Sequence, residues 1–338
     1  MSEGARPNAN VDHGAFVVSL DFELHWGVRD RRAPDGSYRS NLLGERVAVP
    51  ALLDLFKEFD ISATWATVGF LFAGTRDELE RFRPATRPAY VKAGLSAYDE
   101  PIGAGEADDP LHYARSLVDL IAATPGQELG THTFSHYYCL EPGQDAETFR
   151  ADLKSAIAIA EHQGSTLRSL VFPRNQASSA HIAVARELGL TAYRGSQVGA
   201  AYRAAVDEHY ESSARRAWRL LDSYVARPSR SLISWDEILE PSGMANVAAS
   251  CFLRPYSPRL KRLDTLRLKR IVSALEHAAS TNRLFHLWWH PHNFGAHLDE
   301  NLAFLREVLE RFSELRERTG MRSMAMRDVA EVVSMREV

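Results

Sequence analysis

The sequence AFVVSLDFE, at residues 15–23, predicts how this chain folds. Its first six residues are apolar except for Ser19, and a run of this length suits a strand that is buried on both faces, as in parallel sheets. Asp21 and Glu23 follow where the run ends. Because they are two residues apart, their side chains point the same way on an extended segment. The stretch therefore predicts a buried parallel strand with an acidic pair at its end.

Further apolar runs of strand length recur along the chain, and segments with helical periodicity separate them. Strands are expected at residues 61–68, 127–130, 167–172, 191–194 and 284–289. Helices are expected at residues 51–59, 111–123, 146–163, 179–188, 212–225, 264–279 and 300–318, and a short strand and a helix close the chain. Pro50 is expected to open the first helix. This alternation predicts βαβ units and a parallel sheet, and so an α/β fold.

The length and composition fit one large globular domain. The 338 residues are 45% hydrophobic and 25% charged, an ordinary balance for a chain with a sizeable core. The length alone would allow two domains, but α/β barrels often reach this size as one. We expect a disordered tail at residues 1–13 and a single domain at residues 14–338. Two irregular excursions, near residues 73–110 and 200–262, are predicted to be long insertions.

Charge and cysteine content narrow the class of protein further. A net charge of −4 and a pI near 6.4 give no strong attraction to nucleic acid or anionic lipid. Two cysteines, Cys139 and Cys251, make no disulfide framework and fit a reducing compartment. No apolar run approaches a membrane span, and the first residues lack the apolar segment of a secretory signal. We therefore expect a soluble cytoplasmic protein with no nucleic-acid partner and no integral membrane segment; the oligomeric state stays open.

Two histidines, His132 and His136, follow the strand expected at residues 127–130. On a helical turn this spacing would place both imidazoles on one face, and neutral imidazole is the commonest protein ligand for metal ions. The carboxyl ends of the strands in a parallel barrel converge on one rim, so the histidines should meet the acidic pair. Two histidines and one carboxylate supply the three protein ligands of an open catalytic zinc site. The second carboxylate could then act as the base.

A group of histidines follows the last long apolar run: His286, His290, His292 and His297. Spacing alone does not choose between His290 and His292 as a general acid. Arg174 comes directly after another expected strand. It could orient or tune a carboxylate, or it could be an ordinary surface arginine. These residues extend the candidate site along the same rim of the barrel.

Taken in order, these motifs resemble those of the polysaccharide deacetylase family, the NodB-homology group of carbohydrate esterases similar to family 4. The matching segments are SLDFE at residues 19–23, ATWATVG at 63–69, HTFSH at 132–136, FPR at 172–174 and LWWHP at 287–291. The likeness runs from residue 15 to about residue 295, which is most of the chain. HTFSH after Glu-Leu-Gly is its most specific part.

The resemblance implies a distorted (β/α)7 barrel, similar to a TIM barrel, and a divalent metal, usually zinc. It also implies hydrolytic removal of an N-acetyl group from an amino sugar. Carried over to this sequence, Asp21 would be the general base, His290 the general acid, and Arg174 the partner that positions Asp21. The implied metal ligands are Glu23, His132 and His136. We expect three neighbours of these motifs to contact the substrate: Trp26, Tyr137 and His292.

Two departures from the family pattern concern the acidic and arginine motifs. Phe22 stands where the family has its second aspartate, so that Glu23, one residue later, is assigned as the third ligand. Pro173 precedes Arg174, whereas the common order is arginine, spacer, proline. The altered order is consistent with a different substrate. Without a predicted signal peptide, a nucleotide-linked or lipid-linked amino sugar, made in the cytosol for surface polysaccharide, fits better than mature cell wall.

Other functions remain to be weighed against this reading. A related hydrolase could cleave the C–N bond of a cyclic amide or ureide with the same residues. A metal-free glycosidase using Asp21 would leave the histidines without a role. A non-catalytic barrel that binds sugar would not need a base, ligands and an acid together. Metal content and substrate screening separate these possibilities.

Overall fold

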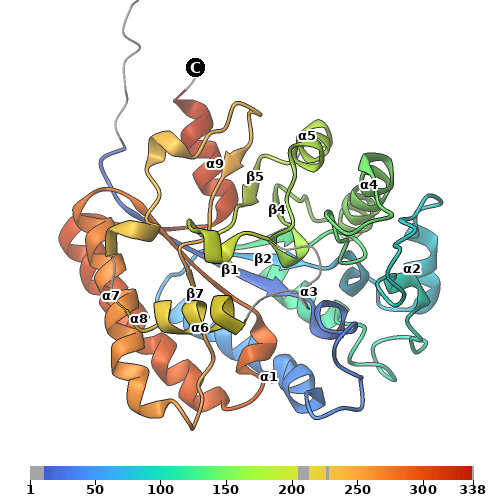
Figure 1. Cartoon of the computed structure of the whole chain (residues 1–338), viewed down its shortest axis with the longest axis horizontal. Coiled ribbons are helices and arrows are strands. Elements are labelled where there is room, and N and C mark those ends of the chain that lie inside the picture. Colours follow the sequence, from blue (N-terminus) through green and yellow to red (C-terminus); the bar gives the residue numbers. More distant parts are fainter. Residues whose placement is uncertain (1–10, 205–212, 226–227, 337–338) are drawn as a thin grey trace, which may run out of the picture.

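In the part of the chain that the structure describes, the expected strands and two further short ones, β6 and β7, form one nine-stranded sheet whose named strands all pair in parallel (Figure 1). The computed structural model describes residues 11–204, 213–225 and 228–336. The strands are β1 Ala15–Phe22, β2 Ala63–Thr67, β3 Gln127–Thr131, β4 Ser169–Val171, β5 Ala192–Arg194, β6 Ala245–Asn246, β7 Cys251–Phe252, β8 Leu284–Trp289 and β9 Arg322–Met324. Their order is β6-β5-β4-β3-β2-β1-β8-β7, and β9 pairs with the first residues of β1.

One short segment, residues 245–253, closes this sheet. Its first part, β6, pairs with β5, and its second part, β7, pairs with β8. Between them the Val247 amide donates to the Tyr193 carbonyl, and the Ser250 amide donates to the His286 carbonyl, each at 2.9 Å. Both edges of the sheet are thereby joined through the same stretch of chain. The predicted distorted (β/α)7 barrel is confirmed, and the end of the insertion expected at 200–262 is part of that barrel.

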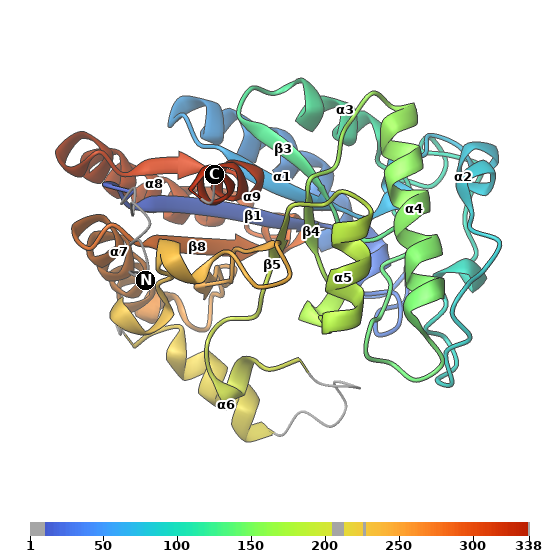
Figure 2. The ribbon, with the colours of Figure 1, turned by 90° about the horizontal axis from the view of Figure 1, so that it is seen from above.

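β1 lies between β2 and β8 and is buried along its whole length (Figure 2). Phe16 and the alternate residues after it belong to the large apolar cluster shared with the surrounding helices. Val17 belongs to a second cluster, which also includes residues of β9 and of helix α9. Ser19 and Asp21 continue the face of Val17, because side chains alternate along a strand. The near-continuous apolar run therefore reflects burial on both faces, as predicted.

Helices surround the sheet (Figure 1). They are α1 Arg39–Glu58, α2 Arg76–Phe82, α3 Arg115–Ala123, α4 Ala146–His162, α5 Ser179–Glu187, α6 Ser213–Asp222, α7 Asp264–Ser280, α8 Leu298–Thr319 and α9 Met326–Met335. Figure 2 shows α6 set apart from the others, beyond the end of β5. The prediction that Pro50 opens the first helix is wrong, because α1 begins at Arg39 and carries Pro50 in its interior. Leu42, Val49 and Phe56 form a buried stripe along α1 that compensates for the missing backbone hydrogen bond.

The N-terminal tail expected at residues 1–13 lies mostly outside the described residues. Within the described part, the His13 ring packs edge-on against Trp235, and the Trp235 indole donates to the His13 carbonyl at 3.1 Å. His13, the last residue of the expected tail, is thus packed against the rest of the protein. The excursion expected at 73–110 contains α2 and a short 3-10 turn, Ala97–Asp99. In the part of the chain that the structure describes, no helix has the length and apolar character needed to span a membrane.

Candidate active site

The carboxyl ends of β1, β3 and β8 bring the predicted acidic and histidine residues to one pocket, as expected for a parallel barrel. Its lining includes Asp21, Glu23, His132, His136, His290 and His292. The pocket also reaches the segment after β5 and the C-terminal half of α6. The strand ends supply the floor of this pocket, and the excursion at 200–262 contributes to its walls.

The acidic pair lies at the buried end of β1. Asp21 is 4% exposed, and Glu23, just beyond the strand, is 2% exposed. Glu23 precedes a 3-10 turn, Leu24–Gly27, in which Leu24 has a positive φ of 45°. This turn folds Gly27 back so closely that a Cβ there would overlap the Glu23 carboxylate. The site therefore requires glycine at this position.

The two histidines of the HTFSH motif are brought together by an irregular loop, whereas the sequence suggested a helical turn. Thr133 and His136 both adopt positive φ angles, 64° and 56°. The imidazole rings of His132 and His136 lie 5.0 Å apart between centroids. Asp152, on α4, fixes the loop: its carboxylate accepts from the Phe134 amide at 2.7 Å and from the amide and hydroxyl of the next residue. The spacing correctly predicted the pairing of the histidines, but the backbone conformation differs.

Glu23, His132 and His136 form a compact donor set. Both imidazole Nε2 atoms lie 3.3 Å from the same Glu23 carboxylate oxygen, Oε2. The outer nitrogen of His132, Nδ1, is 2.8 Å from the Val171 carbonyl, so it carries the proton and leaves Nε2 with a lone pair. Burial lowers the pKa of His136 to about 4, which keeps this imidazole neutral. Neutral imidazoles and an ionised carboxylate fit a divalent metal of the zinc class.

Asp21 is held by an arginine that the sequence reasoning did not select. Arg194 lies at the end of β5, and its guanidinium forms a bidentate ion pair with Asp21, with nitrogen–oxygen distances of 2.6 and 2.7 Å. Arg194 is 1% exposed and also stacks over the Trp288 ring. Burial would raise the pKa of Asp21, but the charge and the hydrogen bonds of Arg194 work against this effect, and the pKa lies below its ordinary value. Asp21 is therefore ionised near neutral pH.

The positioning role predicted for Arg174 thus belongs to Arg194. Arg174 has a positive φ of 55° in the turn after β4, and its guanidinium pairs with Asp30. It also lies 4.2 Å above the centre of the Tyr138 ring. Arg174 still lines the pocket, so it remains a candidate for substrate contact. Because Arg174 follows a strand, the sequence suggested that its side chain would reach Asp21. The left-handed turn directs it elsewhere.

His290 and His292 follow β8 and stack with their ring centroids 4.9 Å apart. The Nε2 atom of His290 lies 3.5 Å from Glu23 Oε1 and 3.7 Å from Asp21 Oδ2, and its side chain is 24% exposed. His292 is 3% exposed, and burial lowers its pKa to about 3. Of the two, His290 combines closeness to both carboxylates with access to the pocket. Geometry thus favours the residue that spacing alone could not select.

Two residues expected to contact the substrate are buried in the protein core. Trp26 is 1% exposed, and its indole donates to the His112 carbonyl at 2.9 Å. Tyr137 is fully buried, and its hydroxyl is 2.7 Å from that of Thr148 on α4. The predictions for Trp26 and Tyr137 are therefore wrong. Each follows a residue of the site in sequence, but the turns after β1 and β3 direct their side chains into the core.

Sequence reasoning missed two residues that shape the site, and each had a signal. Arg194 ends a strand that was predicted correctly, as do the residues that were selected. Asp152 is an aspartate on the buried face of α4, three residues after Phe149 and next to Leu153. A carboxylate among apolar neighbours on one helix face indicates a buried hydrogen-bond partner. Both residues act by holding another part of the site in place.

A family model matches part of this chain, and known structures share its fold. Residues 35–193 match the model of the family described as polysaccharide deacetylase. A putative polysaccharide deacetylase from Mycobacterium smegmatis has a TM-score of 0.57 at 15% identity, covering 100% of this chain and 96% of that one.

A probable polysaccharide deacetylase from Pseudomonas aeruginosa PAO1 gives a TM-score of 0.50 at 13% identity, covering 94% and 89% of the two chains. Puue allantoinase gives 0.51 at 14% identity, covering 98% and 93%. No curated protein matches the sequence. At these identities the solved structures establish the fold. The match over residues 35–193 is to the family that the motifs predicted, and the solved structures show the corresponding fold.

Proposed function

We propose that this protein is a metal-dependent hydrolase that removes an N-acetyl group from an amino sugar. The observation that carries the proposal is the combination of the donor set with a separate base and acid. The donor atoms of Glu23, His132 and His136 lie within 4.8 Å of one another, and Asp21 and His290 line the same pocket. A site that only bound sugar would need neither of the last two.

Each residue has a distinct task in this mechanism. A divalent metal of the zinc class, held by Glu23, His132 and His136, would acidify a water molecule and polarise the amide carbonyl. Asp21 takes the proton of the attacking water, and Arg194 keeps its carboxylate ionised and fixed in orientation. His290 donates a proton to the departing amine. Asp21 and His290 thus act as base and acid, while the metal ligands stay unchanged.

The rest of the pocket supports a substrate that carries negative charge. Its lining contains the three carboxylates Asp21, Glu23 and Asp222 and twice as many arginines: Arg31, Arg174, Arg203, Arg219, Arg254 and Arg270. The net charge of the whole chain is −4, so this concentration of cations is local to the pocket. Guanidinium groups bind phosphate oxygens through paired hydrogen bonds. A sugar joined through a diphosphate to a nucleotide or lipid carrier, as in surface polysaccharide precursors, fits such a lining.

The two cysteines support a cytoplasmic location for this reaction. Cys139 and Cys251 are both buried and free, as is usual in a reducing compartment. Nucleotide-linked sugars are available there. We therefore place the enzyme in the cytoplasm, and separation of soluble and membrane fractions of cells expressing the chain tests this.

A second candidate function is hydrolysis of the C–N bond of a cyclic amide or ureide. The structural likeness to Puue allantoinase, with a TM-score of 0.51, favours including it. Such a ring contains the same kind of amide bond that the base and acid would cleave. It carries no diphosphate, so it leaves the arginines of the pocket unexplained. We therefore rank it second.

A panel of N-acetyl amino sugars linked to UDP, together with allantoin and neutral chitooligosaccharides, tests the proposal. We expect release of acetate from a UDP-linked sugar, its loss after chelation, and its recovery with added Zn²⁺ or Co²⁺. Acetate release from neutral oligosaccharides alone would contradict the anionic carrier but keep the deacetylase. Ring opening of allantoin without acetate release would favour the second candidate. Full activity in protein shown to be metal-free would contradict the mechanism.

A further inference from the structure

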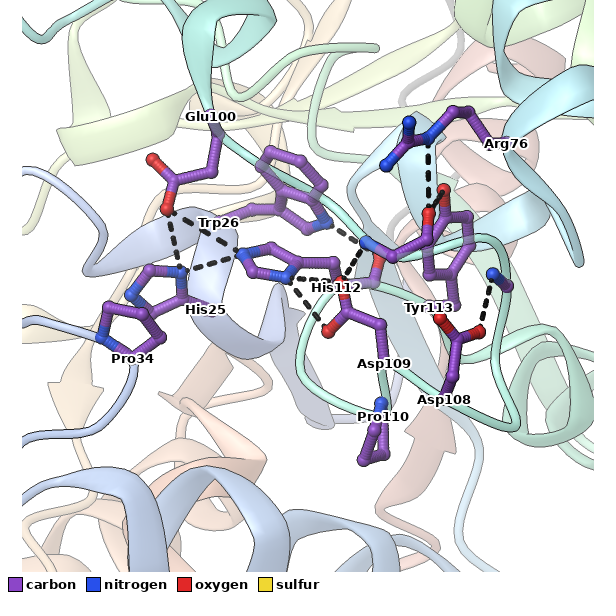
Figure 3. A network of polar contacts seen from close by, with 12 residues as sticks. His25, Trp26, Pro34, Arg76, Glu100, Asp108, Asp109, Pro110, His112 and Tyr113 are labelled. Atoms are coloured by element: carbon purple, nitrogen blue, oxygen red, sulfur yellow. Dashed lines mark hydrogen bonds and ion pairs between the residues drawn. The ribbon is translucent and has the colours of Figure 1, made fainter.

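A second group of histidines and carboxylates lies on the other side of the turn that follows Glu23. It consists of His25, Glu100 and His112, and Figure 3 shows the three side chains directed toward one another. His25 belongs to the 3-10 turn Leu24–Gly27, whereas Glu100 and His112 come from the excursion between α2 and α3. The side chains of His25 and His112 are 0% and 4% exposed, and that of Glu100 is 16% exposed. The function proposed above makes no use of this cluster.

The distances among the three donors match those of a metal site. His25 Nδ1 and His112 Nε2 are 2.9 Å apart. Glu100 Oε1 lies 3.6 Å from the first and 3.8 Å from the second. Ligands bonded at about 2.0 to 2.1 Å to a tetrahedral ion are roughly 3.3 Å from one another. The three measured distances lie on both sides of that value.

In each of the two imidazole rings, one nitrogen faces away from the cluster, and its hydrogen-bond partner shows which nitrogen carries the proton. His25 Nε2 is 2.8 Å from the Arg32 carbonyl. Figure 3 shows the second contact, in which His112 Nδ1 is 2.9 Å from both oxygens of Asp109. Each of these partners can only accept, so each outer nitrogen must donate a hydrogen. In the neutral imidazoles the two inner nitrogens therefore present lone pairs to each other at 2.9 Å, beside a carboxylate. This arrangement is repulsive unless a cation lies between them.

We propose that His25, Glu100 and His112 bind a second divalent metal ion, of the zinc class, that is separate from the ion at Glu23, His132 and His136. Two imidazoles and a carboxylate suit such an ion. Asp109 and the Arg32 carbonyl are the outer hydrogen-bond acceptors that orient histidine ligands in metal sites. The partial exposure of Glu100 leaves a route for the ion from solvent.

The position of this cluster gives the ion a structural role. The His25 amide donates to the Leu111 carbonyl, and the Arg29 guanidinium donates to the Gly94 carbonyl at 2.7 Å. Both contacts join the excursion to the segment that follows β1. The metal would strengthen this junction, and Gly27 of the same turn lines the catalytic pocket. The ion would thus stabilise the segment that supports Glu23 without taking part in the chemistry.

A single proton is the competing cation. Burial lowers the pKa of His112, but its hydrogen bonds with Asp109 and Glu100 outweigh this and raise the pKa above its ordinary value. A protonated His112 could donate to His25 and relieve the repulsion without metal. The two explanations differ in metal stoichiometry, which can be measured directly.

The test is a metal titration of the purified full-length chain after removal of metal with a chelator at mildly acidic pH. Zn²⁺ is added by equilibrium dialysis and bound metal is counted by mass spectrometry. We expect two equivalents for the wild type and one for the pair H25Q/H112Q. The pair H132Q/H136Q should also retain one. His297→Gln is the matched control and should keep two, because its side chain is 44% exposed beside Glu300 and lies outside both clusters.

Glu100→Gln covers the case in which the double variants fail to fold. The change keeps the size of a partly exposed side chain and removes one ligand charge. It should lower the affinity of the second equivalent at least tenfold and leave the first unchanged. Asp109→Asn should lower the affinity for the second equivalent of Zn²⁺ by roughly 10- to 100-fold, the usual effect of losing a hydrogen-bond partner of a metal ligand. One equivalent in the wild type, or a second equivalent that Glu100→Gln leaves intact, would overturn the proposal.

Discussion

The two histidine–carboxylate clusters begin only two residues apart, at Glu23 and His25, and they contain the same donor types. The first is built on the ends of β1 and β3, and the second is built on a turn and a long irregular excursion. The first opens onto the pocket together with Asp21 and His290; of the second cluster, no described residue lines that pocket. The donor set alone therefore does not distinguish a catalytic site from a structural one. The neighbouring base and acid and access to substrate make that distinction.

The largest expected difference between the two clusters follows from replacing one histidine in each. His132→Gln should lower the rate of acetate release on the order of a thousandfold or more, because metal catalysis contributes several kcal/mol. His25→Gln should lower it by no more than about tenfold, the lower end of effects outside the ligand set. Steady-state rates with matched metal analyses check both. Equal losses would mean that the second cluster takes part in the reaction.

The next comparison separates the two carboxylates of β1. Asp21→Asn keeps the shape but removes the base, so the rate should fall roughly a hundredfold or more while metal content stays near normal. Glu23→Ala removes a ligand and should lower metal occupancy, which excess Zn²⁺ should partly restore. Metal titration with activity measurements distinguishes them. If Asp21→Asn is the variant that loses metal, the roles of the two residues are exchanged.

A third comparison concerns the stacked histidines after β8. His290→Ala should lower kcat by about a hundredfold, because His290 faces both carboxylates and the pocket. His292→Ala should have the smaller effect on kcat, since its ring is buried and packs edge-on against Tyr38. Turnover and bound metal are measured for both. A larger kcat loss in His292→Ala would assign the acid to His292.

The fourth comparison tests the exchange of roles between Arg174 and Arg194. Arg194→Lys cannot form the bidentate ion pair with Asp21. Because the base would then be misplaced, kcat should fall roughly 10- to 100-fold. Arg174→Lys should mainly raise KM for an anionic substrate, because this residue pairs with Asp30 and lines the pocket. The split between kcat and KM is the readout. A kcat loss confined to Arg174→Lys would restore the role predicted from sequence.

The smallest effect concerns a buried carboxylate with no histidine beside it. Glu128, on β3, accepts from the hydroxyls of Thr64 and Ser169, each at 2.6 Å. Burial raises the pKa of Glu128 above its ordinary value. The folded chain therefore favours the protonated form. Stability from this group is complete below the ordinary pKa and is lost as pH rises through the folded-state pKa.

Glu128→Gln should remove this part of the pH dependence and change the free energy of unfolding by about 1 kcal/mol. The variant should remain folded, because the amide can donate to the Ser169 hydroxyl. Urea unfolding of both proteins from pH 4 to pH 8 measures the change. The two unfolding curves should diverge as the pH rises. Parallel curves would show that Glu128 does not titrate in this range.

Most of the fold was predictable because the longer buried strands appear in the sequence as local apolar runs followed by polar residues, whereas the two-residue strands β6 and β7 gave no such run. Asp21, Glu23, His132 and His136 could be placed by this rule alone. Arg194 follows the same rule, but its partner lies 173 positions away, and only the closed barrel brings β5 opposite β1. The second cluster had no local signal, because His25, Glu100 and His112 come from irregular segments with no periodicity.

The side chains beside the motifs were predicted less well, for a geometric reason. Trp26 and Tyr137 follow Leu24 and His136, whose positive φ angles turn the chain sharply. A side chain one or two residues beyond such a turn cannot be placed by strand alternation. Neighbours in sequence to a catalytic residue are thus poor candidates for substrate contact wherever the strand ends in a left-handed turn.

The segment at residues 245–253 has a consequence for synthesis of the protein on the ribosome. It emerges after β5 but needs β8, which ends at Trp289, to complete its second set of hydrogen bonds. Until then β1 has no partner on its β8 side. A nascent chain that stops before residue 290 would carry exposed strand edges, which invite pairing with other chains. Such chains would also lack His290. The last strand that closes the barrel, β8, and the proposed general acid are therefore synthesised together.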